Sequence, residues 1–562
     1  MSVERRRYSE ERRKRLLRRA LPVTAGLAVL ILVITLLVTG GASPAVTGAR
    51  RFVAAWERSD YSAMRALITP EAQRRYAFPA FQRAYRAAAG TATATGVAAI
   101  GKVRDAPGGA AVPLEFRTRL FGTLTGRLEL PMAGSRVKWS PELVFPGLQP
   151  GQILNRRSDP PRRAAILARD GRTIVSGSAT ARVPSGAGSA ISGGTGPAAT
   201  VAERDALYAR GFPRDWPVGH GGLEAILETQ VAGRPGGTLY AGTRRVASAA
   251  PRPAHAVRTT IDLGLESSAQ SALAGRVGGI AVLDPRTAEV RALAGIAFSA
   301  PQPPGSTFKL ITLSAVLEGH IAKPTTPFPV SSYAVIDGVK LSNANGESCG
   351  VNVAEGFVQS CNSVYAPLGV RVGARRLVAM AERYGWNTRP PFAGARPSTI
   401  PAADQMASKL EVGSSAIGQG RVLATPLQMA MVAQTIASGG LERTPTIMPG
   451  PLTPPRRVLS IHTAHTIRKL MVAVVARGTG VSAALGTGVV AGKTGTAELE
   501  STTGPSATPA DKRTHTDAWF TSFAPARSPR IVVAVMLYRA GAGGDVAAPT
   551  ARQVLAAGLA RR

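Results

Sequence analysis

The sequence predicts a multidomain α+β protein with a single transmembrane helix near its N-terminus. Three observations support this fold class. The chain has 562 residues, which is more than one domain usually holds. One uncharged apolar run follows a basic stretch near the N-terminus, and helix-like and strand-like patterns are mixed along the remainder. A hydrophobic content of 44% fits globular domains and excludes both a disordered chain and a protein with many membrane spans.

Residues 1–19 are predicted to form a basic cytoplasmic tail, and residues 20–41 a transmembrane anchor. The tail contains RRRYSEERRKRLLRR, and the anchor reads ALPVTAGLAVLILVITLLVTGG. About 20 apolar residues span a bilayer, and a basic flank stays in the cytoplasm. The run is also longer than the apolar core of a signal peptide. We therefore expect a single-pass protein of the cell membrane, with the N-terminus in the cytoplasm and the rest of the chain outside it.

The formal net charge of +34 would suit an acidic partner such as nucleic acid, an acidic wall polymer or anionic lipid. However, only 10 of the 68 basic residues are lysines, so an arginine-rich coding bias explains the charge equally well. The sequence contains no RNP-type aromatic motif, zinc-finger spacing or Walker loop. We therefore expect no nucleic-acid partner.

Two further modules precede the largest block of the chain. Residues 45–154 begin with broken helical spacing and continue with alternating strand-like stretches, and we expect a spacer module without chemistry of its own. Residues 155–255 contain a strand, an Asp-Gly turn and a second strand in RRAAILARDGRTIV. The segment 176–200 is rich in Gly, Ser and Ala, and it predicts a mobile surface loop.

The segment PPGSTFKLITLSAVLEG predicts a helix that is apolar nearly all round and therefore buried. Ser306 and Lys309 are three residues apart, so they share one face of its first turn. A helix N-terminus and burial both disfavour an ammonium, so a neutral Lys309 could take the proton of Ser306. The alternative is a helix-capping serine and a lysine without a role, because S-x-x-K alone is a common pattern.

Two later motifs favour the catalytic interpretation. Ser360-Cys361-Asn362, if locally extended, projects Ser360 and Asn362 to one side. Lys493-Thr494-Gly495-Thr496 follows a β-branched run, and as a strand it turns both threonines to one face, while Gly495 leaves room for a substrate backbone. The ordered set S-x-x-K, S-x-N and K-T-G is typical of penicillin-binding proteins and class A β-lactamases.

With these motifs the chain resembles the class B penicillin-binding proteins, which are peptidoglycan D,D-transpeptidases. Cys361 stands where the family's middle motif often has Asp, and the family accepts several residues there. Further stretches carry the resemblance: TTIDLGLESSAQSAL (Thr259–Leu273), IAVLDPRTAEVRALAG (Ile280–Gly295), SSAIGQGRVLATPLQMA (Ser414–Ala430) and DAWFTSFAPA (Asp517–Ala526).

The resemblance also implies the domain order. Residues 45–154 resemble the cone-shaped, NTF2-like module of the methicillin-resistance-type penicillin-binding proteins. Residues 155–255 would be the dimerisation or pedestal domain. Residues 256–562 would be the transpeptidase domain, an antiparallel sheet flanked by helices with an all-helical subdomain.

The family's catalytic roles transfer to five residues. Ser306 would be acylated by the penultimate D-Ala of a stem peptide, with Lys309 as general base. Ser360, with the charge of Lys493 behind it, would relay the proton to the leaving amine. Asn362 would bind a substrate amide and hold Lys309 in place.

The remaining roles concern substrate binding. The backbone N–H groups of Ser306 and Thr496 would form the oxyanion hole, where one donor is typically worth ~3 kcal/mol. The hydroxyls of Thr494 and Thr496 would hold the terminal carboxylate beside Gly495. The resemblance implies neither a metal nor an organic cofactor.

Cys349 and Cys361 are the two cysteines of the chain. An even count in an exported chain favours a disulfide, which would pin the loop that carries Ser360 and Asn362. The alternative is two unpaired buried thiols.

The function implied is a membrane-anchored D,D-transpeptidase that cross-links stem peptides ending in D-Ala-D-Ala and that β-lactams acylate. We expect a glycosyltransferase of the divisome or elongasome as a partner. A D,D-carboxypeptidase would use the same site with water as acceptor. A β-lactam sensor without turnover is another alternative, although a cytoplasmic tail of about 19 residues is short for an effector domain.

Overall fold

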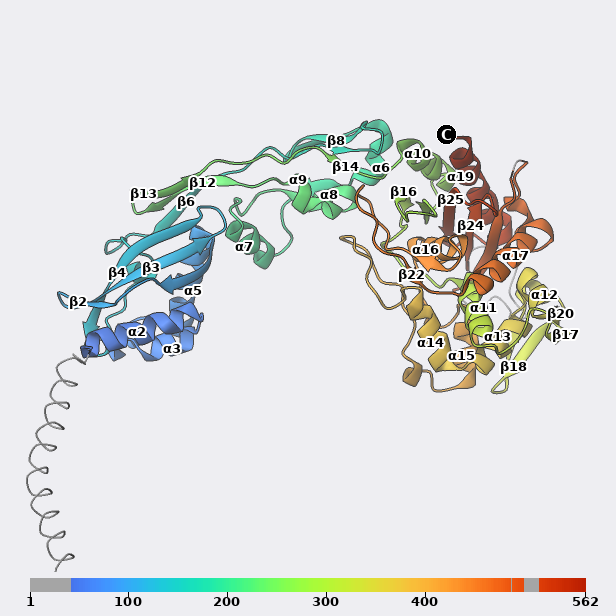
Figure 1. Cartoon of the computed structure of the whole chain (residues 1–562), viewed down its shortest axis with the longest axis horizontal. Helices are drawn as coiled ribbons and strands as arrows, with labels where there is room; N and C mark the ends of the chain where they lie inside the picture. The colour runs from blue at the N-terminus through green and yellow to red at the C-terminus, as the bar shows by residue number, and fades with distance from the viewer. Residues whose placement is uncertain (1–41, 487, 500–514, 562) are drawn as a thin grey trace, which may run out of the picture. The chain divides into compact units, whose positions relative to one another are not determined.

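The computed structural model describes residues 42–486, 488–499 and 515–561 (Figure 1). The predicted cytoplasmic tail, 1–19, and the predicted anchor, 20–41, lie outside the described residues. Within the described ranges, none of the helices has the length and apolar character needed to cross a membrane.

The chain forms two compact units, and each is described by itself. The first contains the described residues up to Pro160, with Ala199–Asp215 and Arg234–Arg252. The second contains Pro161–Ala198, Trp216–Gly233 and the chain from Pro253 onward. The domain limits expected from the sequence, 45–154, 155–255 and 256–562, stay a prediction.

In the first unit, helices pack on an antiparallel sheet of order β1-β3-β4-β5, in which β2 also pairs with β3. A separate sheet has the order β13-β12-β6. The apolar positions of the predicted first helix explain the packing, because Phe52, Val53 and Trp56 are buried against the sheet. The main elements are α2 (Pro44–Glu57), α3 (Tyr61–Ala66), α4 (Pro70–Arg75), α5 (Phe78–Ala92), β1 (Ala94–Ala99), β2 (Arg104–Ala106), β3 (Gly109–Thr118), β4 (Thr123–Ala133), β5 (Arg136–Val137), β6 (Leu154–Asp159), α7 (Val201–Ala209), β12 (Gly236–Ala241) and β13 (Arg244–Ala249).

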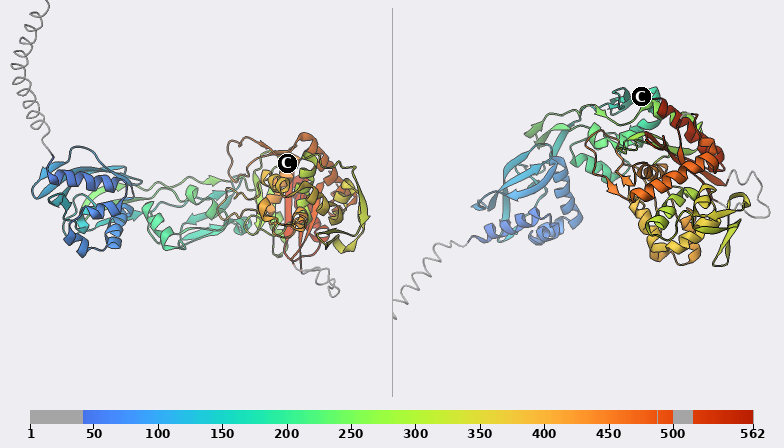
Figure 2. Two further views of the ribbon diagram at one scale, coloured as in Figure 1. Left: turned by 90° about the horizontal axis from the view of Figure 1, so that it is seen from below. Right: turned by 45° about the vertical axis from the view of Figure 1, so that its right-hand side comes forward.

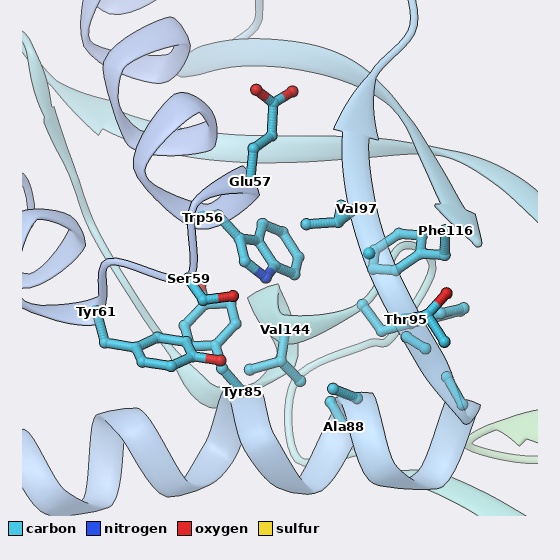
Figure 3. Close-up of a pocket in the computed structure, with 15 residues that line it drawn as sticks. Trp56, Glu57, Ser59, Tyr61, Tyr85, Ala88, Thr95, Val97, Phe116 and Val144 are labelled. Carbon is cyan, nitrogen blue, oxygen red and sulfur yellow. The ribbon is translucent and has the colours of Figure 1, made fainter. Parts of the chain in front are cut away.

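A pocket of about 150 Å³ opens in this unit between the end of α2, helix α5 and strand β1 (Figure 3). The rings of Trp56, Tyr61, Tyr85 and Phe116 line it. Trp56 and Tyr85 meet edge to face with their ring centroids 4.9 Å apart. Small side chains such as Ala88 complete the wall.

The second unit contains a five-stranded sheet of order β16-β15-β25-β24-β23 in which all neighbouring strands are antiparallel. Its central strands are buried on both faces because helices cover both: every residue of β24 and β25 is buried, and β25 is apolar throughout. The strands are β15 (Gly278–Leu283), β16 (Val290–Gly295), β23 (Ala491–Glu498), β24 (Thr516–Ala524) and β25 (Ile531–Leu537).

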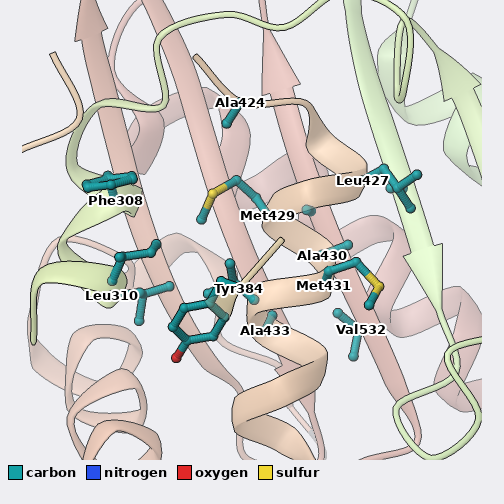
Figure 4. Close-up of a cluster of buried hydrophobic side chains, with 14 of the residues drawn as sticks. Phe308, Leu310, Tyr384, Ala424, Leu427, Met429, Ala430, Met431, Ala433 and Val532 are labelled. Carbon is teal, nitrogen blue, oxygen red and sulfur yellow. The ribbon is translucent and has the colours of Figure 1, made fainter. Parts of the chain in front are cut away.

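Two layers of helices cover this sheet, which confirms the predicted antiparallel sheet flanked by helices. On one face lie α10 (Leu263–Leu273) and α19 (Ala548–Ala560), the latter in dark red in Figure 2. On the other face, α16 (Pro426–Ala437) packs Met429 and its neighbours against the sheet, and Phe308 and Leu310 join the same cluster (Figure 4). The segment with S-x-x-K is thereby anchored in the core.

The region next to α11 (Lys309–Glu318) is helical but not entirely so, and the prediction of an all-helical subdomain was wrong in this respect. Two small antiparallel pairs, β17 with β20 and β18 with β19, accompany the helices. The elements are α12 (Val353–Val358), α13 (Asn362–Val372), α14 (Ala374–Arg383), α15 (Lys409–Ala416), α17 (Ile461–Arg477), β17 (Pro327–Ser331), β18 (Tyr333–Ile336), β19 (Val339–Ser342) and β20 (Cys349–Asn352).

The segment 176–200, predicted as a mobile loop, contains short regular elements instead. They include β8 (Thr173–Ser178), β9 (Ala181–Pro184) and α6 (Ser189–Ser192). Ile191 is buried, and a Cβ on Gly188 would lie 2.4 Å from the carbonyl oxygen of Ile174. The small residues therefore permit close packing here. A composition rich in Gly, Ser and Ala is typical of flexible loops as well, so composition alone does not separate the two cases.

Candidate active site

Ser306 and Lys309 lie at the start of the buried helix, as the sequence predicts. The first turn, η3 (Gly305–Phe308), is 3₁₀, and α11 continues from Lys309 to Glu318. All residues of α11 from Lys309 to Val316 are buried, in agreement with its apolar character. The Nζ atom of Lys309 lies 3.0 Å from the Oγ atom of Ser306.

The amine of Lys309 is fully buried and contacts four oxygen atoms. Besides Ser306 Oγ, it lies 2.5 Å from the carbonyl oxygen of Ser360, 2.7 Å from Oδ1 of Asn362 and 3.5 Å from Ser360 Oγ. Burial lowers the pKa of Lys309 well below its usual value, and the nearby charge of Lys493 lowers it further.

A neutral amine has two N–H donors and one lone pair. The two carbonyl-type oxygens, on Ser360 and Asn362, can each accept one N–H of Lys309. The lone pair is then left for the hydroxyl of Ser306. The fourth neighbour, Ser360 Oγ at 3.5 Å, can accept the third N–H that Lys309 gains when it takes a proton. The arrangement therefore suits removal of the Ser306 proton by Lys309.

Ser360 and Asn362 reach Lys309 through a turn and not through an extended segment. Ser360 follows α12 with a φ of +62°, and Asn362 is the first residue of α13. The condition of a locally extended segment, under which both side chains would project to one side, is therefore not met. The left-handed turn directs the backbone carbonyl of Ser360, as well as the Asn362 side chain, at the amine. The Nδ2 atom of Asn362 donates to the carbonyl oxygen of Ser342, 2.7 Å away, which fixes the amide.

Lys493 reaches the same cluster from strand β23. Its Nζ atom donates to Ser360 Oγ at 2.8 Å and lies 5.5 Å from the ring centre of Phe357. The side chain is fully buried, and burial lowers the pKa of Lys493 to about 7. Ser306, Lys309, Ser360 and Lys493 thus form one continuous hydrogen-bonded chain.

The cleft in front of this chain has a volume of about 600 Å³. Ser306, Ser360 and Asn362 line one side, and Thr494 and Thr496 line the wall that β23 provides. The backbone N–H of Gly543, at the start of η7 (Gly543–Ala547), donates to Thr496 Oγ1 at 3.1 Å.

Gly495 has a different role from the one predicted. A Cβ atom at this position would lie 2.7 Å from the carbonyl oxygen of Pro304 and 2.9 Å from Cγ2 of Thr307. The space beside Gly495 is therefore filled by the segment that carries Ser306 and is not left for a substrate. Gly305 makes the reciprocal approach, since a Cβ there would lie 2.6 Å from the carbonyl oxygen of Thr496. Two glycines allow the nucleophile segment and β23 to touch.

Cys349 and Cys361 are joined by a disulfide in the structure, with their Cα atoms 6.0 Å apart. Cys361 is fully buried between Ser360 and Asn362, and Cys349 belongs to β20 at the edge of the cleft. The link therefore connects β20 to the turn that carries both Lys309 partners.

Thr479 lines the cleft together with Ser306, although no motif of the sequence singles it out. Thr479 follows α17 in the stretch Gly478-Thr479-Gly480, and its Oγ1 atom lies 2.5 Å from Thr494 Oγ1. A Gly-Thr-Gly stretch after a helix is the only local signal, and it indicates a turn without indicating where the turn lies.

Comparison with known proteins relates this site to one family. Residues 278–556 match the family model described as the penicillin binding protein transpeptidase domain. The peptidoglycan D,D-transpeptidase PbpA of Mycolicibacterium smegmatis is 37% identical over 296 residues, which cover 47% of this chain and 56% of that protein. The chain thus spans little more than half the length of this curated relative.

Solved structures show the same fold. The D,D-transpeptidase domain of a peptidoglycan glycosyltransferase from Eggerthella lenta superposes with a TM-score of 0.58 at 26% identity, covering 71% of this chain and 98% of that one. The penicillin G acyl-enzyme complex of penicillin-binding protein A from M. tuberculosis gives 0.55 at 25% identity, covering 71% and 100%.

Proposed function

We propose that the whole protein is a class B D,D-transpeptidase that cross-links peptidoglycan through a serine acyl-enzyme, since residues 278–556 match the model of the penicillin binding protein transpeptidase domain. The observation that carries this proposal is the hydrogen-bonded chain from Ser306 through Lys309 and Ser360 to Lys493. Its reactive end faces a cleft large enough for a peptide.

Acylation begins when the neutral amine of Lys309 takes the proton of Ser306. The Oγ atom attacks the carbonyl carbon of the penultimate D-Ala in the donor stem peptide. The backbone N–H groups of Ser306 and Thr496 stabilise the negative charge on the oxygen of the tetrahedral intermediate. The close approach of the two segments at Gly305 and Thr496 supports this pairing.

Collapse of the intermediate breaks the C–N bond to the terminal D-Ala. The nitrogen of the leaving D-Ala receives the hydroxyl proton of Ser360. Lys309 then gives Ser360 the proton that it took from Ser306. The hydrogen bond from Lys493 to Ser360 Oγ supports this relay. The terminal carboxylate is held by the hydroxyls of Thr494 and Thr496, and Asn362 orients a substrate amide.

Deacylation reverses these steps with a new nucleophile. An amine of a second stem peptide attacks the ester carbonyl, loses its proton to Lys309, and releases Ser306 as the alcohol. A β-lactam acylates Ser306 by the same first step, with opening of its ring.

The remaining parts of the proposal concern location and partners. The segment 20–41 anchors the protein in the cell membrane, with residues 1–19 in the cytoplasm. Residues 45–154 are an NTF2-like module, and the packing of their helices on a sheet supports this assignment. Residues 155–255 are a pedestal domain. A glycosyltransferase of the divisome or elongasome supplies the glycan strands that carry the stem peptides.

The experiment that tests this function uses the protein in detergent with a pentapeptide stem ending in D-Ala-D-Ala, with and without an amine acceptor, followed by mass analysis. A cross-linked product that forms only with the acceptor supports transpeptidation. Hydrolysed tetrapeptide at the same rate in both reactions indicates a D,D-carboxypeptidase. A stable acyl-enzyme with penicillin but no turnover of the peptide indicates a β-lactam sensor.

A further inference from the structure

Thr479 is held in the cleft by three different elements, although the reaction described above gives it no role. Its backbone N–H donates to the carbonyl oxygen of Val358, at the end of α12, at 3.4 Å. A Cβ on Gly544, in η7, would lie 2.5 Å from the carbonyl oxygen of Thr479. Its hydroxyl meets Thr494 on β23. Contacts with three other elements therefore fix the position of Thr479, in addition to the loop to which it belongs.

The hydroxyls of Thr479 and Thr494 lie 2.5 Å apart, so one of them donates to the other. One hydroxyl proton forms the hydrogen bond between the two oxygens, and the other hydroxyl proton can be donated to a ligand. Because a threonine hydroxyl rotates, both can also turn outward and donate to one acceptor with two oxygens. A carboxylate is such an acceptor.

The cleft offers few cationic groups for this task, which leaves hydroxyls as the donors. Among the described residues that line it, Lys340 is the only cationic one, and its Nζ lies 4.1 Å from the ring centre of Tyr333. No described arginine lines the cleft. The amines of Lys309 and Lys493 are fully buried behind the surface. The carboxylates of Glu347, Glu498 and Asp545 also line the cleft, so a substrate carboxylate needs hydrogen-bond donors to be held there. Near β23 these donors are the threonine hydroxyls, with Lys493 behind them.

We propose that Thr479 binds substrate directly, as a third threonine that holds the terminal carboxylate of the donor peptide together with Thr494 and Thr496. This inference rests on the proposed function and deepens it. It predicts that the enzyme selects donors with a free carboxylate at this position and that Thr479 provides part of that selection.

The test compares two probes that differ only in this group, benzylpenicillin and its methyl ester, on the full-length protein. The second-order acylation rate constant is measured by intact mass for the native protein, Thr479→Val and Thr479→Ser. Thr521→Val is the matched control, because Thr521 Oγ1 donates to the carbonyl oxygen of Met429 in the core, at 2.8 Å, and does not line the cleft.

We expect the native protein to prefer the acid over the ester. Thr479→Val should lower acylation by the acid about ten- to a hundredfold, the usual loss of a hydrogen bond to a charged group, and leave the ester within twofold. Thr479→Ser should retain the preference, and Thr521→Val should leave the ratio of the two rates unchanged.

Equal losses on acid and ester would indicate a structural role and overturn the proposal, as would a native protein without preference or a Thr479→Val variant that retains it. If Thr479→Val does not fold, Thr479→Ala is measured in the same way, since it also lacks the hydroxyl. If the proposed transpeptidase function were wrong, a different result would show it: penicillin would still acylate a protein that lacks Ser306.

Discussion

The contact between Gly305 and Thr496 makes a quantitative prediction for Gly305→Ala. The added Cβ would lie 2.6 Å from the carbonyl oxygen and 2.8 Å from the carbonyl carbon of Thr496, whereas ordinary contact begins at 3.4 Å. The two segments must therefore separate by about 0.8 Å, which exceeds the tolerance of about 0.5 Å for a catalytic constellation. The two proposed oxyanion donors, on Ser306 and Thr496, are on opposite sides of this contact.

We expect Gly305→Ala to lower the acylation rate constant for benzylpenicillin by at least a hundredfold, since loss of one such donor costs about 10²–10³. The variant also places alanine at a φ of +51°, which costs roughly 1–2 kcal/mol of stability. Gly275→Ala is the matched control, because Gly275 has a φ of +76° and no atom within 4 Å of the added Cβ.

Acylation is followed by intact mass, and stability by thermal unfolding. Both variants should unfold at a lower temperature than the native protein, and only Gly305→Ala should lose acylation. If Gly305→Ala acylates within tenfold of the native rate, or if both variants lose acylation equally, the reasoning from this contact is refuted.

Three further predictions follow from the site and the sequence. Because burial lowers the pKa of Lys309 well below its usual value of 10.5, the acylation rate should fall with decreasing pH only at a pH well below 10.5, where the amine becomes protonated; a loss of rate with a midpoint near 10.5 would instead indicate a base of ordinary lysine pKa. Replacing both Cys349 and Cys361 by Ser should cost about 3 kcal/mol of stability on the loop-entropy model and slow acylation more than tenfold; two titratable thiols in the native protein, or an unchanged rate, would contradict this. Residues 42–562, expressed without the predicted anchor, should remain in the supernatant after centrifugation and bind penicillin; sedimentation with membranes would reveal a second attachment.

Local sequence predicted the parts of the site that local geometry determines. The spacing of Ser306 and Lys309 places both on one helical turn in any context, and the apolar residues that follow require burial. The antiparallel sheet was expected only from the family resemblance, which DAWFTSFAPA (Asp517–Ala526) helps to carry, and β24 and β25 are buried over their whole length in the structure.

Tertiary contacts determined the parts that the sequence did not predict. Ser360 takes a left-handed turn because α12 ends beside the start of α13, and no residue pattern specifies that φ. Gly495 is required by its close contact with Pro304, nearly two hundred positions earlier in the chain. The K-T-G motif alone does not indicate this contact. Thr479 was missed because its function depends on a hydroxyl supplied by another element, Thr494 on β23.

Ser306 is the nucleophile of the proposed reaction, and peptide mapping of the penicillin adduct identifies the acylated residue. The full-length protein is incubated with benzylpenicillin, digested and analysed by mass spectrometry, beside Ser306→Ala. We expect one adduct, on the peptide that contains Ser306, and none on a Ser306→Ala protein that unfolds at the native temperature. An adduct on any other residue, or one that persists in Ser306→Ala, would contradict this assignment.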